Sequence, residues 1–192
     1  MGLGGAPSPD ALRFLTRLAN EHSSGNRGLR CNIEGTRFAL RFPGKAGAYD
    51  TIYQVTESTH FANAALWAAT EQRCGNQAFN ITNGDYFRWR NLWPKIADVF
   101  EMQVGDPETI CLTQQMAENS PLWEEMTTKY GLKSVMYTDL VAWPFADYVF
   151  GADWDIMSDV TKSRLYGFQE VVDSEAMFMR LLRRFREERI VP

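Results

Sequence analysis

Helical spacing of apolar side chains dominates this chain, and only a few short segments show the alternation typical of a strand. Trp89, Leu92, Trp93 and Ile96 recur every three or four residues, which predicts a helix over residues 88–100. Further helices are predicted over residues 57–72, 107–118, 121–130, 138–150, 158–166 and 174–188. Strands are predicted only at residues 37–42, 51–55 and 78–81, with a closing edge strand at 190–191. No repeating strand–helix–strand unit results, so we expect a helix-rich α+β fold without a complete Rossmann domain.

The first 36 residues differ in character from the rest of the chain. They are rich in glycine, serine, asparagine and arginine, and one amphipathic helix is expected among them, at residues 9–22. Two explanations of this atypical leader remain open: a non-native segment, which we favour, or a genuine extension. Residues 37–192 are expected to form one globular domain.

Charge and composition argue against several classes of function. The formal net charge is −4 with mixed signs, which gives no reason to expect a nucleic acid or an anionic membrane as partner. No apolar run approaches the roughly 20 residues that span a bilayer, and the first ten residues lack the features of a secretory signal. We therefore expect a cytoplasmic protein. The three cysteines and two histidines lack the spacings of disulfide frameworks and zinc sites, so no metal is expected.

The usual sequence signatures of catalysis are missing. The glycine cluster at residues 2–5 follows no apolar strand, so it does not predict a nucleotide-binding loop. None of the seven tyrosines has a lysine four residues later, so there is no Tyr-x-x-x-Lys pair for proton transfer to a carbonyl or enol. No catalytic residue is predicted from the pattern alone.

Two charged clusters each allow a functional and a structural interpretation. Asp147, Asp153, Asp155 and Asp159 lie among aromatic residues, so a sugar-like ligand framed by rings is one hypothesis. We favour local roles for these carboxylates in loops and near helix N-termini. The arginine-rich residues 180–189 suggest either an anionic partner or, as we favour, the solvated face of a helix.

An ordered set of short segments nevertheless resembles a known family. The segments are LRFPG at 40–44, LWAAT at 66–70, NQAFN at 76–80, NGD at 83–85, FRWR at 87–90, LWP at 92–94, PLW at 121–123 and IVP at 190–192. In this order they resemble the carboxy-terminal half of the progesterone 5-beta-reductase and iridoid synthase family. These proteins are atypical extended short-chain dehydrogenases, and the similarity covers roughly residues 37–192.

The resemblance implies a function for residues 37–192. Family members are NADPH-dependent reductases of carbon–carbon double bonds conjugated to a carbonyl, so these residues would be the substrate-binding domain for a small hydrophobic carbonyl compound. Phe145 matches a family aromatic that lines the substrate pocket, although Pro144 replaces a second aromatic of the usual pattern. Tyr53 matches, more weakly, a segment that approaches the ligand.

The family's catalytic tyrosine and lysine and its glycine-rich cofactor loop lie upstream of the RFPG segment, where this chain has residues that do not resemble them. We therefore expect a chain that is inactive alone and binds no cofactor alone. The alternative is a stand-alone, non-catalytic binding or interaction module derived from the same fold. Both hypotheses predict self-association through apolar surface that another domain would cover.

Overall fold

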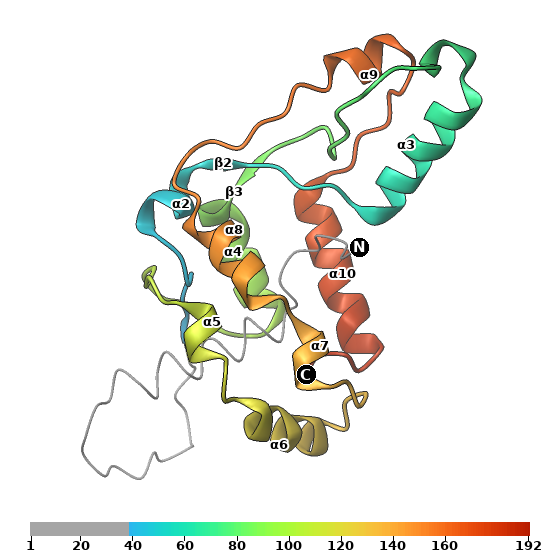
Figure 1. Cartoon of the computed structure of the whole chain (residues 1–192). Helices are drawn as coiled ribbons and strands as arrows, with labels where there is room; N and C mark the ends of the chain where they lie inside the picture. Colours follow the sequence, from blue (N-terminus) through green and yellow to red (C-terminus); the bar gives the residue numbers. More distant parts are fainter. Residues whose placement is uncertain (1–38) are drawn as a thin grey trace, which may run out of the picture.

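A computed structural model of the protein describes residues 39–192 (Figure 1). The helix expected at residues 9–22 and the boundary expected after residue 36 lie outside these residues. The described part is helix-rich with a few very short strands, as expected for the α+β class. Its elements are β1 Ala39–Leu40, α2 Ala46–Asp50, β2 Ile52–Tyr53, α3 Ser58–Thr70, the 3-10 helix η1 Gln72–Cys74, β3 Phe87–Arg88, α4 Trp89–Val99, β4 Gln103–Val104, α5 Leu112–Gln115, α6 Ser120–Tyr130, α7 Tyr137–Leu140, α8 Trp143–Gly151, α9 Thr161–Leu165 and α10 Ser174–Glu187.

The strands of the described part form two sheets of two strands each. β1 and β4 are parallel, with Ala39 opposite Gln103, whereas β2 and β3 are antiparallel, with Tyr53 opposite Phe87. The predicted strands at 78–81 and 190–191 are wrong, because neither range forms a strand. Alternating apolar residues alone do not make a strand; each strand also requires a neighbouring backbone with which to pair.

Helices α3, α4, α6 and α10 lie close to their predicted bounds, but the helix predicted over residues 107–118 is wrong in its first half. Helix α5 begins only at Leu112. Before it, the backbone N–H groups of Glu108 and Ile110 donate to the carbonyl oxygens of Phe42 and Pro43. This stretch therefore runs beside residues 42–43 and does not coil.

Two other helix predictions need correction. Residues 138–150 form the two helices α7 and α8, because Pro144 lies in the first turn of α8 and cannot continue a helix from the preceding residues. Helix α9 begins at Thr161, later than the predicted residue 158. The short helix α2 was not predicted.

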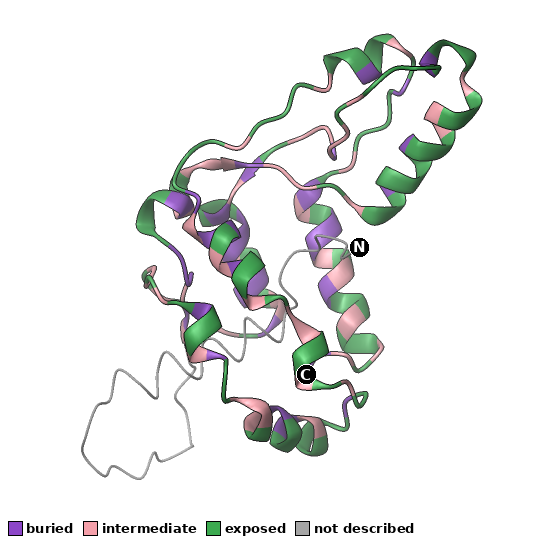
Figure 2. Ribbon diagram, in the orientation of Figure 1, coloured by how far each residue is buried: buried purple, intermediate pink, exposed green. Residues whose placement is uncertain are grey.

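The hydrophobic core lies in what we call the main body, residues 39–57, 83–158 and 172–192 (Figure 2). Trp93 of α4 is fully buried, and its indole N–H donates to the carbonyl oxygen of Leu40 at 3.2 Å. Its ring meets that of Phe42 edge to face, with centroids 5.2 Å apart, and Phe150 of α8 meets Phe42 in the same way at 5.2 Å. Met177, Phe178 and Leu182 of α10 complete the core, in agreement with the predicted apolar face of that helix.

Residues 58–82 and 159–171 form an outer lobe that carries α3 and α9 and lies apart from the core helices (Figure 1). The lobe has a small aromatic cluster of its own. Trp67 of α3 packs against Phe79 and Phe168 with centroid distances of 4.9 and 5.2 Å. The ammonium of Lys162 lies 5.0 Å from the Phe79 ring centroid and donates to the carbonyl oxygen of Ala78 at 2.9 Å.

The NGD segment at residues 83–85 joins the outer lobe to the main body. Asn83 is fully buried, and its side-chain oxygen accepts from the backbone N–H of Glu57 at 2.7 Å. Its amide nitrogen donates to the Ser174 hydroxyl at 3.0 Å. The Asp85 carboxylate accepts from both the N–H and the hydroxyl of Ser174, at 2.7 and 2.6 Å. Three separate stretches of chain are therefore held together where they pass between the two regions.

Candidate functional site

Helix α8 presents two aromatic side chains on its exposed side. Phe145 and Tyr148 are 42% and 59% exposed, and their ring centroids lie 6.4 Å apart with an interplanar angle of 31°. The opposite side of the helix buries Ala146, Val149 and Phe150 in the core, which fixes the orientation of the helix. Phe145 is therefore held on an apolar surface, while its contact with a substrate stays a prediction.

Tyr53, the second predicted site residue, lies beneath this surface. It is 9% exposed, and its ring packs against those of Phe87 and Trp89 at 6.0 and 5.7 Å. Burial raises the pKa of Tyr53, and the neighbouring Tyr148 raises it further. The influence of Tyr148 on this pKa shows that the two tyrosines are close in space.

Tyr148 thus links both predicted residues, and we call Phe145, Tyr148 and Tyr53 the α8 aromatic surface. The sequence analysis did not assign a binding role to Tyr148. Its position three residues after Phe145, on a helix whose apolar positions 146, 149 and 150 face the other way, was the signal that identifies it. Such a surface of rings is suited to pack against a flat hydrophobic ligand.

The four clustered carboxylates have separate local roles, as the favoured interpretation holds. Asp147 accepts from the backbone N–H groups of Leu112 and Thr113, at 2.6 and 3.0 Å, at the start of α5. Asp153 pairs with Lys45 at 3.1 Å, and this hydrogen bond lowers the pKa of Asp153.

The other two carboxylates bind backbone groups. Asp155 accepts from the N–H of Ile52 at 2.8 Å, and Asp159 accepts from the N–H of Thr161 at 2.7 Å near the start of α9. Hydrogen bonds from Thr161 lower the pKa of Asp159. Because each carboxylate already serves a loop or a helix start, the four do not converge on one ligand.

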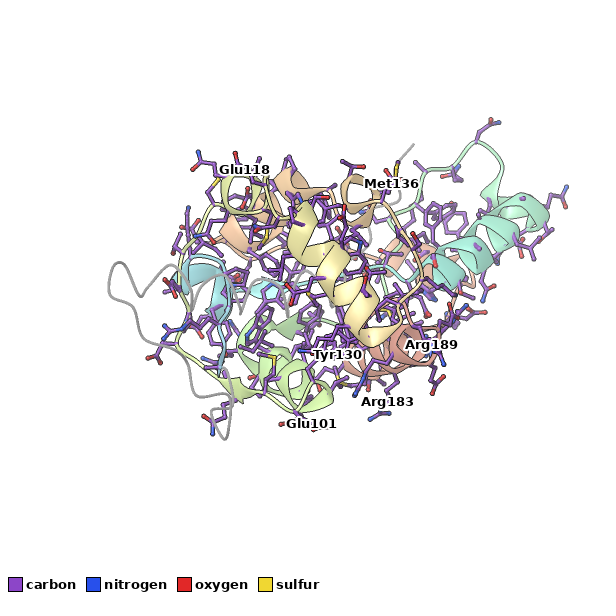
Figure 3. The ribbon with its side chains drawn as sticks, turned by 90° about the horizontal axis from the view of Figure 1, so that it is seen from below. Glu101, Glu118, Tyr130, Met136, Arg183 and Arg189 are labelled. Atoms are coloured by element: carbon purple, nitrogen blue, oxygen red, sulfur yellow. The ribbon has the colours of Figure 1, made fainter. Side chains whose placement is uncertain are left out.

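The arginine-rich helix α10 also fits its structural interpretation. Arg184 donates to Glu188 at 2.6 Å, Arg180 pairs with Glu57, and Arg186 donates to the carbonyl oxygen of Val99 at 2.7 Å. Arg183 and Arg189 lie on the outer side of the molecule, close to the end of α6 (Figure 3). These side chains form the solvated face of a helix whose other face is buried in the core.

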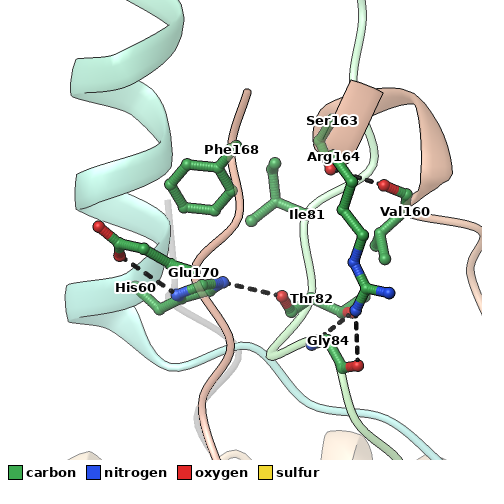
Figure 4. A pocket seen from close by; sticks show the side chains of 9 residues that line it. All are labelled: His60, Ile81, Thr82, Gly84, Val160, Ser163, Arg164, Phe168 and Glu170. Atoms are coloured by element: carbon green, nitrogen blue, oxygen red, sulfur yellow. Dashed lines mark hydrogen bonds and ion pairs between the residues drawn. The ribbon is translucent and has the colours of Figure 1, made fainter. Parts of the chain in front are cut away.

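A small polar pocket lies in the outer lobe (Figure 4). Buried His60 approaches the carbonyl oxygen of Thr82 through Nε2 at 3.0 Å, and its Nδ1 lies 3.8 Å from the Glu170 carboxylate. The empty space is about 210 Å³, below the range of pockets that hold drug-sized ligands. The remaining lining residues are Ile81, Gly84, Val160, Ser163, Arg164 and Phe168. This pocket is too small to be the site of a hydrophobic carbonyl substrate.

The described residues do not fit a dinucleotide. Gly44 and Gly47 flank the start of α2, but a Cβ on Gly44 would lie 2.0 Å from the carbonyl oxygen of Phe150. Gly44 is therefore required for close packing of two backbones and does not cradle a phosphate. Within residues 39–192, no group of three or more His, Cys, Asp and Glu side chains could hold a metal ion. Over the same residues, every helix is too short or too polar to cross a membrane.

Comparison with known proteins decides the family. A family model described as a PRISE-like Rossmann-fold domain matches residues 24–192. The chain belongs to the PRISE-like family. It is 32% identical over 165 residues to the (S)-8-oxocitronellyl enol synthase ISY2 of Nepeta racemosa. It is 28% identical over 165 residues to the 3-oxo-Delta(4,5)-steroid 5-beta-reductase of Arabidopsis thaliana.

These matches confirm the family resemblance seen in the motifs and cover 84% of this chain in both cases. They cover only 41% and 42% of the two relatives, so the PRISE-like chain spans about two fifths of the length of the relatives it matches. The α8 aromatic surface lies within the matched family region. The family match begins at residue 24, inside the segment interpreted as a leader, so the boundary at residues 36 and 37 stays a prediction.

Proposed function

We propose that this chain is the substrate-binding part of an NADPH-dependent reductase of carbon–carbon double bonds conjugated to a carbonyl. The observation that carries the proposal is the PRISE-like match over residues 24–192, together with relatives named as an enol synthase and a steroid 5-beta-reductase. The proposed partner is therefore a small, hydrophobic, carbonyl-containing substrate, and the proposed location is the cytoplasm.

The α8 aromatic surface is the proposed contact with that substrate. The exposed rings of Phe145 and Tyr148 would cover one side of a hydrophobic ligand, and Tyr53 supports them from beneath. Burial of one aromatic side chain contributes about 1.5–3 kcal/mol, so the loss of one ring should weaken ligand binding measurably. The surface is open in the described residues, so a second wall is required to enclose the ligand.

We further propose that this chain does not reduce an enone by itself. Two features support this: no tyrosine is followed by a lysine four residues later, and the glycines of the described part do not form a phosphate cradle. Hydride and proton transfer would depend on groups that residues 39–192 do not supply. We assign no catalytic step to this chain.

The test combines an activity measurement with a binding measurement. The purified chain with NADPH and 2-cyclohexenone should show no enone-dependent loss of absorbance at 340 nm. Ligand-detected NMR should show binding of the same enone, weakened about fivefold or more in Phe145→Ala. Phe61→Ala, which removes an exposed aromatic ring of the outer lobe, is the matched control and should bind as the unchanged chain does. Enone-dependent NADPH oxidation by this chain would contradict the proposed inactivity.

The alternative function is a stand-alone, non-catalytic binding module. The observation in its favour is the continuous core of the main body, which includes fully buried Leu40, Phe42, Trp93 and Phe150 and suits a domain that folds alone. Cooperative unfolding of a monomer that binds the enone without cofactor would support this function. Concentration-dependent sedimentation would instead support the proposed self-association through uncovered apolar surface.

A further inference from the structure

Residues 78–82 have the hydrogen-bonding pattern of an unpaired sheet edge. Within the described part of the chain, the five backbone N–H groups of this segment donate no hydrogen bond. Several carbonyl oxygens, by contrast, are occupied by side chains: Lys162 donates to Ala78 at 2.9 Å, and Thr56 donates to Ile81 at 3.1 Å. A row of unpaired N–H groups is a template for pairing with another strand.

The same segment alternates in burial as a strand does. Phe79 and Ile81 are half-buried, whereas Ala78 and Asn80 are exposed. One set of side chains already faces the lobe, through the contact of Phe79 with Trp67 at 4.9 Å. The sequence pattern that predicted a strand here is therefore present, but its neighbouring strand is missing.

Helix α3, which precedes this segment, is apolar on the side that faces away from the lobe. Its 13 residues include no Asp, Glu, Lys or Arg. Phe61 and Leu66 are 55% and 65% exposed, and Ala62, Ala65 and Ala69 lie between them on the same exposed face. A helix that is apolar on its buried and its exposed faces is typical of one covered on both sides.

Taken together, α3 and residues 78–82 form a helix followed by a strand-like segment. This is the second half of a strand–helix–strand crossover, in which the helix covers one face of a parallel sheet and the following strand joins that sheet. Within residues 39–192 there are only two sheets of two strands each, and neither includes residues 78–82. The sheet required by this unit must therefore come from polypeptide outside the described residues.

We propose that the outer lobe docks on a Rossmann-fold sheet, with residues 78–82 added as a strand and the exposed face of α3 covering the sheet. The occupant is the Rossmann-fold portion of the PRISE-like family, because the family model describes such a fold and the relatives extend about three fifths of their length beyond this match. This inference rests on the proposed function and names the surface by which the substrate-binding part joins the nucleotide-binding part.

The test uses the full chain and, as probe, the portion of the Nepeta racemosa relative outside its match to this chain, co-expressed with it. Hydrogen exchange should be fast at residues 78–82 in the isolated chain, because their N–H groups are unpaired, and about tenfold or more slower in the complex. Protection of these amides in the dilute isolated chain would overturn the proposal. So would a complex that leaves them unprotected, or a soluble probe that does not bind.

Two variants and a control sharpen the test. Ala78→Pro removes one unpaired N–H and no hydrogen bond of the isolated chain, so it should leave the melting temperature unchanged and weaken docking about tenfold. Leu66→Glu places a charge on the exposed face of α3 and should weaken docking by a similar factor or more. Met136→Glu changes a residue of the main body that is 67% exposed and should have no effect on docking.

The outcomes separate docking from function. A complex that protects residues 78–82 but does not reduce 2-cyclohexenone with NADPH would support docking and contradict the proposed function. A mixture that reduces the enone without protecting these residues would support the function and overturn the docking. Protection that rises with the concentration of the isolated chain would assign the surface to a second copy of this chain and also overturn the proposal.

Discussion

In the main body, large apolar side chains from α4, α8 and α10 meet in a continuous core, whereas the outer lobe is held by a thin aromatic cluster and by side chains bound to backbone oxygens. Four of the fully buried side chains of the body, Phe42, Trp93, Phe100 and Phe150, are aromatic. In the lobe, Trp67 and Phe79 are only half-buried, and Lys162, Arg164 and Arg73 each donate to a carbonyl oxygen. Figure 2 shows the same contrast in the distribution of buried residues.

This difference indicates that stability is distributed unevenly between the two regions. Removal of apolar surface from water scales with buried area, so the main body should contribute most of the free energy of folding. Polar contacts of an exposed lobe exchange with water and contribute little each. We therefore expect the outer lobe to open locally while the body remains folded, until a docked partner covers α3.

The largest expected effect comes from removing a core ring. Trp93→Ala should lower the free energy of unfolding by about 3–5 kcal/mol, because it leaves a cavity between Phe42 and Leu40. The matched change in the outer lobe, Trp67→Ala, should cost only about 1–2 kcal/mol, since that ring is half-buried. Urea unfolding followed by far-UV circular dichroism measures both. Equal losses for the two variants would show that the regions are equally important to stability.

The next effect concerns the junction between the regions. Asn83→Ala should cost about 2–3 kcal/mol, because it leaves the buried N–H of Glu57 without its acceptor and removes the bond to Ser174. It should also separate the unfolding of the outer lobe from that of the main body. Unfolding monitored by circular dichroism and by hydrogen exchange in α3 and α10 would detect this separation.

Asn80→Ala is the control for that prediction. Asn80 is exposed and makes one bond, to the carbonyl oxygen of Asp159 at 3.1 Å. Its replacement should change the free energy of unfolding by less than about 1 kcal/mol. A single cooperative transition in Asn83→Ala would contradict the role of Asn83 as the joint between the two regions.

The sequence predicted the main body better than the outer lobe for a physical reason. The apolar faces of α4 and α10 are buried by contacts within the described chain, so their periodicity alone identified them. The strand predicted at residues 78–81 failed because its pairing depends on a second backbone, which no local pattern reports. The start of α5 was missed for a related reason: the residues after Pro107 bond to Phe42 and Pro43, which are distant in sequence.

The candidate site was only partly predictable for the same reason. Phe145 and Tyr53 came from a family resemblance, and the structure links them through Tyr148, a residue that periodicity on α8 alone was sufficient to find. The local roles of the four carboxylates followed from their positions near helix starts, where unpaired N–H groups attract anions. The partner of each carboxylate, such as Lys45 for Asp153, is 108 residues away and required the structure.

A smaller effect is expected at the helix start held by Asp147. Asp147→Ala should cost about 1–2 kcal/mol, because the carboxylate accepts from the N–H groups of Leu112 and Thr113 and from the Thr113 hydroxyl. Chemical unfolding measures the loss, and Asp147→Asn should recover part of it, since an amide oxygen still accepts. Recovery by neither variant, with stability unchanged, would show that this cap contributes nothing to the main body.

The smallest effect is expected at the corresponding carboxylate of the outer lobe, Asp159. Hydrogen bonds from the hydroxyl and the N–H of Thr161 lower the pKa of this carboxyl. The stabilisation is therefore present above the ordinary aspartate pKa and is lost as the pH falls through the lowered pKa of the folded state. The amide resonance of Thr161 should titrate with a midpoint below that of a model aspartate, and Asp159→Asn should abolish the titration. Because the carboxylate is exposed, global unfolding should not change detectably. A global loss comparable with that of Asp147→Ala would mean that α9 is coupled to the core, which would break the distinction between the two regions.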